Sequence, residues 1–237
     1  MDSAATPTVL LVHGAFEDSG SWAGTLRAAR HLTADLGAVP NPLRGLDHDA
    51  TEVAAAAAAV PGPVLLAGHG YGGAVASVAA TRCANVVALA YVAAFLPGPD
   101  TSVVDLLHRS GSHAFLAALV PSGPGDAAEL YLEQRAYPEI FAADLDPDAA
   151  ATAAALQRPV RACAFEERPA AVAGPGLPSW YLVTTEDLVL APAVQRESAA
   201  RAGSRTAEVD ASHAVLLSRP DAVAALIGVA LTHRRNP

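Results

Sequence analysis

The sequence VLLAGHGYGG at residues 64–73 constrains the fold more than any other part of the chain. It begins with a short apolar run, which is typical of a strand buried on both faces. Four glycines within the next six residues, followed by small side chains, fit a tight turn into a helix that packs closely on a sheet. This unit of strand, turn and helix predicts an α/β protein with a parallel sheet.

The rest of the chain alternates apolar runs with helical segments, as in a mostly parallel, doubly wound sheet covered by helices. We predict further strands at residues 8–12, 86–92, 179–184 and 206–209. We predict helices at residues 22–32, 50–60, 73–82, 191–202 and 221–233.

Residues 97–168 differ from this pattern, because they carry scattered prolines and show no clear strand. Short helical pieces are expected at 103–107, 127–135 and 149–156, and the segment is too long for an ordinary loop. We therefore expect a small helical cap inserted into the sheet domain. The predicted division is a first core part at 1–96, a helical cap at 97–170 and a second core part at 171–237.

Composition excludes several classes of protein. A chain of 237 residues with 52% hydrophobic and 16% charged residues does not have the composition of a disordered protein. The formal net charge of −9 repels phosphate backbones, so we expect no nucleic-acid partner. No apolar stretch reaches the roughly 18–20 residues that span a bilayer, so we expect no membrane association.

The N-terminal residues 1–7 have neither a basic region nor a long apolar region, so we expect no secretory signal and a cytoplasmic location. Cys83 and Cys163 lie far apart and outside any CxxC pattern, which favours free thiols over a disulfide or a metal site. The chain contains no metal, nucleotide or flavin motif, so we expect no cofactor. We expect a small molecule as its substrate and consider a homodimer as its assembly.

The glycine-rich turn has the context of a nucleophile elbow, in which a G-x-S-x-G turn joins a strand to a helix. Gly68 and Gly72 fit that pattern, but its centre is Gly70, where the elbow needs serine, aspartate or cysteine. A second signal is the His-Gly pair that precedes Ala15, directly after the first strand. In such folds the amide after this pair helps to bind an oxyanion, together with the amide after the elbow centre, here Tyr71.

Two further signals follow late strands. Asp187 ends the sequence Thr-Glu-Asp after the strand at 179–184, and His213 ends Asp-Ala-Ser-His after the last strand. Asp187 precedes His213 by 26 residues, so the order along the chain is elbow, acid and histidine, as in α/β-hydrolases. Glu186 is an alternative acid, but we interpret it as a solvated loop residue. Ser212 points away from its neighbour on an extended segment, so we discount it as a nucleophile.

With these motifs the chain resembles the small, capped α/β-hydrolases that include EstC-like esterases, plant methyl esterases and hydroxynitrile lyases. The segments that carry the resemblance are HGAFEDSGSW (13–22), GHGYGG (68–73), SWYLVTTEDLVLAP (179–192) and SHAVLLSRP (212–220). The resemblance implies an α/β-hydrolase fold with His213 as the catalytic histidine, Asp187 as its acid and the amides of Ala15 and Tyr71 as the oxyanion hole. Gly70 matches the position of the nucleophile and replaces the serine.

Without a hydroxyl at residue 70, the chain cannot form an acyl-enzyme by the route of this family. We expect a cofactor-free enzyme in which His213 acts as a general base and the two amides stabilise an enolate or oxyanion. Such a site supports a lyase, cyclase or isomerase reaction on a small apolar carbonyl compound. The alanine-rich, lysine-poor composition resembles that of high-GC actinobacterial proteins, in which such variants often serve natural-product pathways. Two alternatives stay open: a hydrolase that uses a water activated by His213 on an ester or lactone, and an inactive homologue that binds a small molecule.

The remaining candidates concern the pocket. We place Phe16, His69 and Phe95 at the substrate pocket, because they stand at the loop and strand ends that carry ligand sites in α/β folds. Glu17 is interpreted as part of a solvated acidic loop. His108 and His113 of the cap are candidates to reach the cavity, with no role assigned, and their spacing of five is unlike that of metal ligands on a helix.

Overall fold

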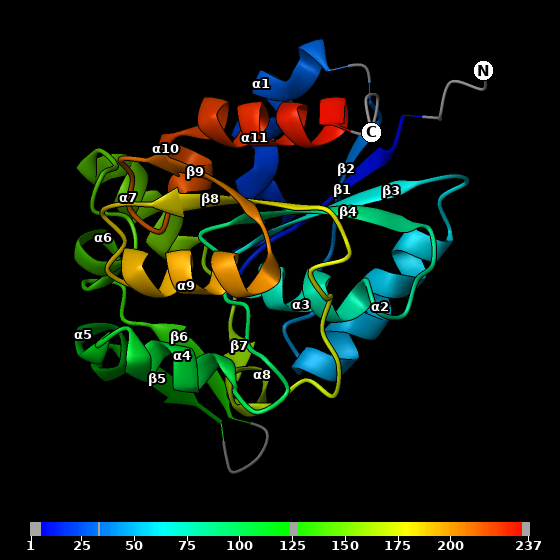
Figure 1. Ribbon diagram of the computed structural model, residues 1–237. Helices are drawn as coiled ribbons and strands as arrows, with labels where there is room; N and C mark the ends of the chain where they lie inside the picture. The colour runs from blue at the N-terminus through cyan, green and yellow to red at the C-terminus, as the bar shows by residue number, and fades with distance from the viewer. Residues whose placement is uncertain (1–5, 33, 124–127, 234–237) are drawn as a thin grey trace, which may run out of the picture.

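The computed structural model describes residues 6–32, 34–123 and 128–233, and its centre is a six-stranded sheet in which every neighbouring pair is parallel. The order across the sheet is β2-β1-β3-β4-β8-β9 (Figure 1). The strands are β1 (Thr8–Val12), β2 (Leu36–Val39), β3 (Val64–His69), β4 (Val86–Val92), β8 (Ser179–Thr184) and β9 (Arg205–Val209).

Successive side chains of the central strands enter two different cores. On β1, Val9 and Leu11 belong to one apolar cluster, while Leu10 and Val12 belong to the other. Every residue of β3 is buried, as expected of a strand covered on both faces. The continuous apolar runs from which strands were predicted in the sequence therefore arise because both faces of the sheet are covered.

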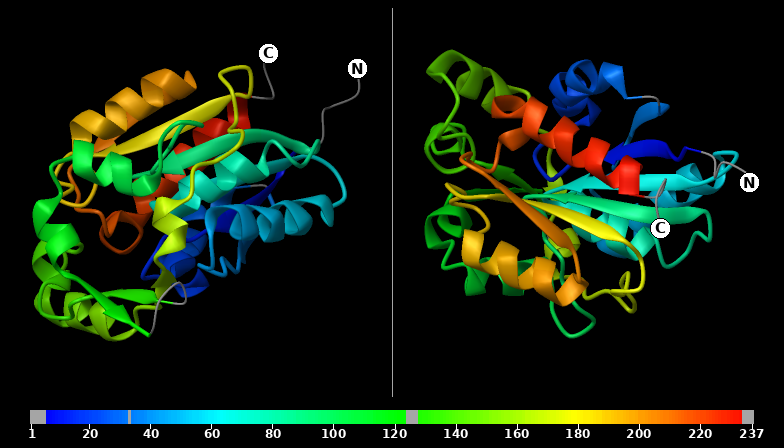
Figure 2. Two further views of the ribbon diagram at one scale, coloured as in Figure 1. Left: turned by 90° about the horizontal axis from the view of Figure 1, so that it is seen from below. Right: turned by 45° about the horizontal axis from the view of Figure 1, so that its top comes forward.

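Helices cover both faces of the sheet, which confirms the doubly wound arrangement. The pictured helices α1 and α11 lie on one face, and α2, α3 and α9 lie on the other (Figures 1 and 2). Their bounds are α1 (Ala23–Ala28), α2 (Leu46–Ala58), α3 (Tyr71–Ala79), α9 (Pro192–Ala202) and α11 (Pro220–His233), with the short helix α10 (Val215–Ser218) before the last and the 3-10 turns η1 (Ser19–Trp22) and η2 (Ala29–His31) around the first.

The segment between β4 and β8 packs on the loops that follow the parallel strands. The Ser112 hydroxyl donates to the Val189 carbonyl at 2.6 Å, and the Ala214 amide donates to the Phe141 carbonyl at 2.9 Å. The segment therefore covers the carboxyl ends of the strands (Figure 2). Its elements are α4 (Val103–Arg109), α5 (His113–Ala117), β5 (Leu119–Ser122), β6 (Glu129–Leu132), α6 (Tyr137–Ile140), α7 (Pro147–Ala155), β7 (Val160–Arg161) and α8 (Cys163–Glu166).

This segment is not purely helical. Its strands β5, β6 and β7 form a three-stranded antiparallel sheet, and the helix expected at 127–135 is wrong, because residues 129–132 form β6. Residue 127 lies outside the described residues. The side chain of Gln157 accepts from the Leu132 amide at 2.9 Å and donates to its carbonyl at 2.8 Å, which continues the strand pairing. Contacts with distant residues thus decide the structure of this segment. The division of the chain into core and cap at residues 97 and 170 stays a prediction.

The other strands and helices of the core match the sequence-based expectations, with shifted ends. Strand β2 was missed, because it is a short, half-buried edge strand that contains Gly37. The helix expected at 22–32 is broken into α1 and its two 3-10 turns. Within residues 6–32, 34–123 and 128–233, no helix combines the length and the apolar character needed to cross a membrane. The expectation about residues 1–7 falls mostly outside the described chain.

Candidate active site

The turn between β3 and α3 depends on glycines that admit no side chain. A Cβ atom on Gly68 would lie 2.4 Å from the carbonyl oxygen of Gly72, and one on Gly72 would lie 2.4 Å from the carbonyl oxygen of Val12. Neither position tolerates such a contact, because the opposing atoms are backbone. The glycines therefore allow helix α3 to begin immediately against the ends of β1 and β3.

Gly70 stands at the tip of this turn, with φ +52° and ψ −122°. Its amide donates to Val92, and its carbonyl accepts from the amides of Gly73 and Phe95, so its backbone is fixed on both sides. A Cβ atom at this position would lie 3.0 Å from Nε2 of His213. Any side chain at residue 70 would therefore point at the imidazole ring.

We expect Gly70→Ala to lower the free energy of unfolding by about 1–3 kcal/mol, because residues other than glycine are strained at this φ and ψ. Urea denaturation of the two proteins measures the difference. Gly176→Ala is the matched control, since Gly176 has no positive φ and has open space around its Cβ position. Equal losses of stability in both variants would contradict strain at Gly70.

His213 and Asp187 form a buried pair. Nδ1 of His213 lies 2.7 Å from Oδ2 of Asp187, and each residue exposes only 3% of its surface. A carboxylate only accepts hydrogen bonds, so Nδ1 carries the proton and donates it. This tautomer leaves Nε2 of His213 with a free lone pair that faces Gly70.

The carboxylate of Asp187 is held by four further donors. Oδ2 also accepts from the hydroxyl of Thr184 and from the amide group of Gln195, each at 2.9 Å. Oδ1 accepts from the backbone amides of Val189 and Leu190, each at 2.8 Å. These bonds fix the orientation of the carboxylate and, through it, that of the imidazole.

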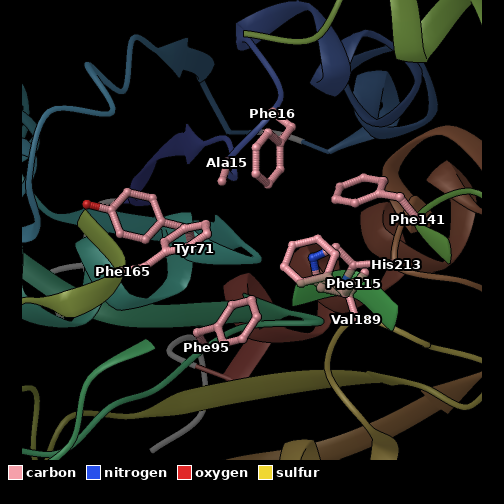
Figure 3. Close-up of a pocket in the computed structure, with 9 residues that line it drawn as sticks. All are labelled: Ala15, Phe16, Tyr71, Phe95, Phe115, Phe141, Phe165, Val189 and His213. Carbon is pink, nitrogen blue, oxygen red and sulfur yellow. The ribbon is translucent and has the colours of Figure 1, made fainter. Parts of the chain in front are cut away.

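Ala15 and Tyr71, the residues whose amides are predicted to form the oxyanion hole, both line the cavity over His213. Within the described part of the chain, neither amide donates to a protein acceptor. The hydroxyl of Tyr71 points away from the other lining residues (Figure 3). It donates to Oδ2 of the buried Asp49 at 2.8 Å. Burial, and next the Asp49 charge, raise the pKa of Tyr71 well above its usual value, so its hydroxyl keeps its proton.

A narrow cavity lies over His213, and its lining is almost entirely aromatic. The space between its walls, together with the solvent at its mouth, amounts to about 240 Å³. All five phenylalanines of the chain line it. The only titratable side chains in the lining are the imidazole and the tyrosine. The lining residues are Ala15, Phe16, Tyr71, Phe95, Phe115, Phe141, Phe165, Val189 and His213 (Figure 3).

The structure places the candidates from the sequence as follows. Phe16 and Phe95 line the cavity, but His69 does not, because both of its ring nitrogens are bonded elsewhere, to Glu17 and to the backbone of His213. His108 and His113 are exposed on α4 and α5 and are absent from the lining.

The interpretation of Glu17 as a solvated loop residue is wrong, since it is 6% exposed and paired with His69. Sequence reasoning also missed Phe115, Phe141 and Phe165, which come from the segment between β4 and β8. They stand in no recognisable motif. Only the gathering of all phenylalanines in one place, which the fold creates, reveals their role in the lining.

The fold and the arrangement of glycine turn, acid and histidine define an α/β-hydrolase. A comparison with protein families agrees, because residues 9–226 match the Alpha/beta hydrolase family, and the chain belongs to that family. No curated protein matches the chain. The family and the fold therefore agree.

Solved structures with the same fold cover nearly the whole chain. A pyrethroid hydrolase from Sphingobium faniae JZ-2 has 21% identity and a TM-score of 0.80, over 96% of this chain and 98% of that one. Tomato methylketone synthase I, in complex with β-ketoheptanoate, has 17% identity and a TM-score of 0.79, over 98% and 100%. Polyneuridine aldehyde esterase has 17% identity and a TM-score of 0.77, over 95% and 99%.

Proposed function

We propose that this chain is a cofactor-free enzyme that transfers protons on a small apolar carbonyl compound, without a nucleophile of its own. One observation carries the proposal: Nε2 of His213, oriented by Asp187, faces a glycine where a hydrolase of this family has its serine. Gly70 stands in the nucleophile position, so the lone pair of Nε2 is available to the substrate.

The lining supplies no replacement for the serine. Among the nine lining residues only Tyr71 carries a hydroxyl, and Asp49 holds it away from the cavity. Ser212 directs its hydroxyl to the Phe141 carbonyl at 3.1 Å and to the carboxylate of Asp144. A covalent intermediate on an activated hydroxyl therefore finds no support in this site.

The remaining groups suit proton abstraction next to a carbonyl. Nε2 of His213 takes the proton from the carbon, the electrons of that C–H bond form the C=C bond of the enolate, and the π electrons of the carbonyl move onto its oxygen. The amides of Ala15 and Tyr71 stabilise the resulting enolate, and the charge of Asp187 stabilises the imidazolium. Return of the proton to another carbon of the conjugated enolate completes an isomerase reaction. Expulsion of a substituent β to the carbonyl, which leaves with the proton, completes a lyase reaction. Attack of the enolate carbon on a second carbonyl of the substrate, whose oxygen takes the proton, completes a cyclase reaction.

The cavity supports an uncharged, apolar substrate. Rings of Phe95 and Phe141 lie 6.1 and 4.9 Å from the imidazole ring of His213, measured between centroids. Apolar walls exclude water and strengthen the electrostatic interactions of the bound oxyanion. The similarity to tomato methylketone synthase I, which was solved with β-ketoheptanoate, supports a carbonyl compound as the ligand class. A place in natural-product biosynthesis is part of the same proposal.

A second candidate is hydrolysis of an ester or lactone by a water that His213 activates. One observation favours it: the esterase and the hydrolase among the structural neighbours. A third candidate is an inactive homologue that binds a small molecule in the aromatic cavity. The three differ in which probe reaction depends on His213.

Two probe reactions on the wild type and on His213→Gln separate these candidates. The first is exchange of the α-protons of acetophenone in D₂O, and the second is hydrolysis of phenyl acetate. We expect His213-dependent proton exchange and no His213-dependent hydrolysis. Hydrolysis that depends on His213, with no exchange, would establish the second candidate. No dependence in either reaction, with acetophenone shown to bind, would leave the binding protein as the better account.

A further inference from the structure

A buried acid–base pair lies beneath the active site and is not used by the proposed mechanism. His69, the last residue of β3, is fully buried, and its Nδ1 lies 2.8 Å from Oε2 of Glu17. Its other nitrogen, Nε2, lies 2.9 Å from the carbonyl oxygen of His213. Oε2 of Glu17 also accepts from the amide of Gly14 at 3.0 Å.

The partners of His69 define its protonation. The carbonyl of His213 can only accept, so Nε2 carries a proton, and a Glu17 carboxylate requires a second proton on Nδ1. Burial by itself lowers the pKa of His69, but the charge and hydrogen bond of Glu17 outweigh it and raise that pKa. Burial raises the pKa of Glu17, and the same pairing reverses the shift and lowers it. Both shifts favour the pairing of a carboxylate with an imidazolium.

The pair connects three segments that are far apart in the sequence. Glu17 holds the amide of Gly14, which is the residue before Ala15 in the loop after β1. His69 precedes Gly70 at the tip of the glycine turn. His213 receives its hydrogen bond through the backbone, 144 residues away. All three groups of the proposed site, namely the general base, the Ala15 amide and the glycine turn, are therefore adjacent to one rigid bridge.

We propose that Glu17 and His69 are positioning residues that fix His213 and the Ala15 amide relative to Gly70. This inference rests on the proposed function, since it assigns the pair to the geometry of that site. Neither residue lines the cavity, so neither contacts the substrate. Their effect passes through the backbone of His213 and of Gly14.

Only a glutamate satisfies all the hydrogen bonds of the bridge. Oε2 accepts from two donors at once, the Gly14 amide and the ring of His69. A glutamine that presents its NH₂ group to His69 would oppose the Gly14 amide with a second donor. A glutamine that presents its oxygen to His69 has no negative charge to maintain the imidazolium. A neutral His69 ring carries one proton, so one of its two nitrogens would face the glutamine oxygen or the His213 carbonyl without a proton to donate. The Glu17→Gln variant therefore loses one bond of the bridge in either orientation.

The Gly70→Ser variant provides a reporter that needs no knowledge of the natural substrate. A serine at this position would react with a fluorophosphonate only if His213 and the oxyanion amides are in place. We expect Glu17→Gln in this background to lower the maximal rate of inactivation by about 10- to 100-fold, the size of effect that a small misplacement produces. The reagent concentration for half-maximal inactivation should change little, because the cavity lining is intact.

Asp18→Asn in the same background is the matched control, since it removes a neighbouring charge from an exposed residue. All variants are compared below their melting temperatures. If Gly70→Ser is labelled and Glu17→Gln makes no difference, or if Asp18→Asn slows labelling as much as Glu17→Gln does, the positioning role is wrong and the proposed function stands. If Gly70→Ser itself is never labelled, the proposed function fails instead.

A spectroscopic test on the wild type does not depend on any variant that could fail to fold. In protein labelled with ¹⁵N-histidine, we expect the ring of His69 to show protons on both nitrogens at neutral pH. Glu17→Gln, where folded, should lose one of them, and Asp18→Asn should lose neither. A wild-type His69 ring with a proton on one nitrogen alone would overturn the ion pair and the inference with it.

Discussion

The Gly70→Ser variant is expected to become covalently labelled by a fluorophosphonate, which should leave the wild type unmodified. The backbone at residue 70 already has the strained conformation that a nucleophile elbow needs, with φ +52° and ψ −122°. A side chain there would point at Nε2 of His213, whose ring need move only a few tenths of an ångström to accommodate it. The introduced hydroxyl would then lie within reach of a general base.

The control for this prediction is Gly70→Ser combined with His213→Ala. We expect labelling to slow by at least about 10³-fold, because the serine loses its general base. Mass spectrometry measures the fraction labelled over time and locates the modified peptide. Labelling at the same rate in both proteins would mean that His213 does not act on residue 70.

The Asp187→Asn substitution in the Gly70→Ser background is expected to slow labelling by roughly 10³- to 10⁴-fold. In the native site, Oδ2 of Asp187 accepts a hydrogen bond from Nδ1 of His213 at 2.7 Å. An asparagine that presents its NH₂ group would instead donate to Nδ1, so the proton of His213 would move to Nε2. The lone pair facing Gly70 would then be lost, although the ring itself stays in place.

Glu186→Gln is the matched control for Asp187→Asn, since Glu186 is the adjacent acid and is exposed. We expect it to leave the labelling rate within about twofold of the Gly70→Ser reference. The comparison uses circular dichroism to establish that both variants are folded. A large loss for Glu186→Gln and none for Asp187→Asn would show that Glu186, and not Asp187, orients His213.

The parts of the fold that sequence predicts well are those fixed by local sterics. The glycines at 68 and 72 are required because backbone atoms lie 2.4 Å from their Cβ positions, so the motif is visible in any chain with this turn. Buried strands such as β3 and β4 are continuous apolar runs for a similar reason, since both of their faces are covered. Asp187 follows the buried strand β8 and His213 follows the exposed edge strand β9, and both lie after the strand ends as the sequence predicted.

The parts that sequence does not predict depend on distant contacts. Strand β6 forms because β5 and β7 pair with it, and nothing within residues 129–132 requires an extended conformation. The burial of Glu17 depends on His69, which is 52 residues away. An acidic residue in a loop after a strand is usually solvated, so the partner that neutralises it cannot be inferred from its neighbours.

The cavity lining contains residues that sequence could place and residues that it could not. Phe16 and Phe95 follow strands that were predicted, and their place near the site could be inferred from the strand ends. Phe115, Phe141 and Phe165 come from a segment whose structure was predicted only in part. Their rings meet only after chain folding; Phe16, for example, lies 6.1 Å from Phe115 and 6.2 Å from Phe165 between ring centroids.

The central claim is that His213 moves protons in a site without a nucleophile, and α-proton exchange in D₂O tests it most directly. Acetophenone is incubated with the wild type and with His213→Gln, and deuterium uptake is followed by NMR. The account predicts exchange by the wild type above the buffer rate and a return to the buffer rate in His213→Gln. Equal rates in the two proteins, with acetophenone bound by both, would contradict it.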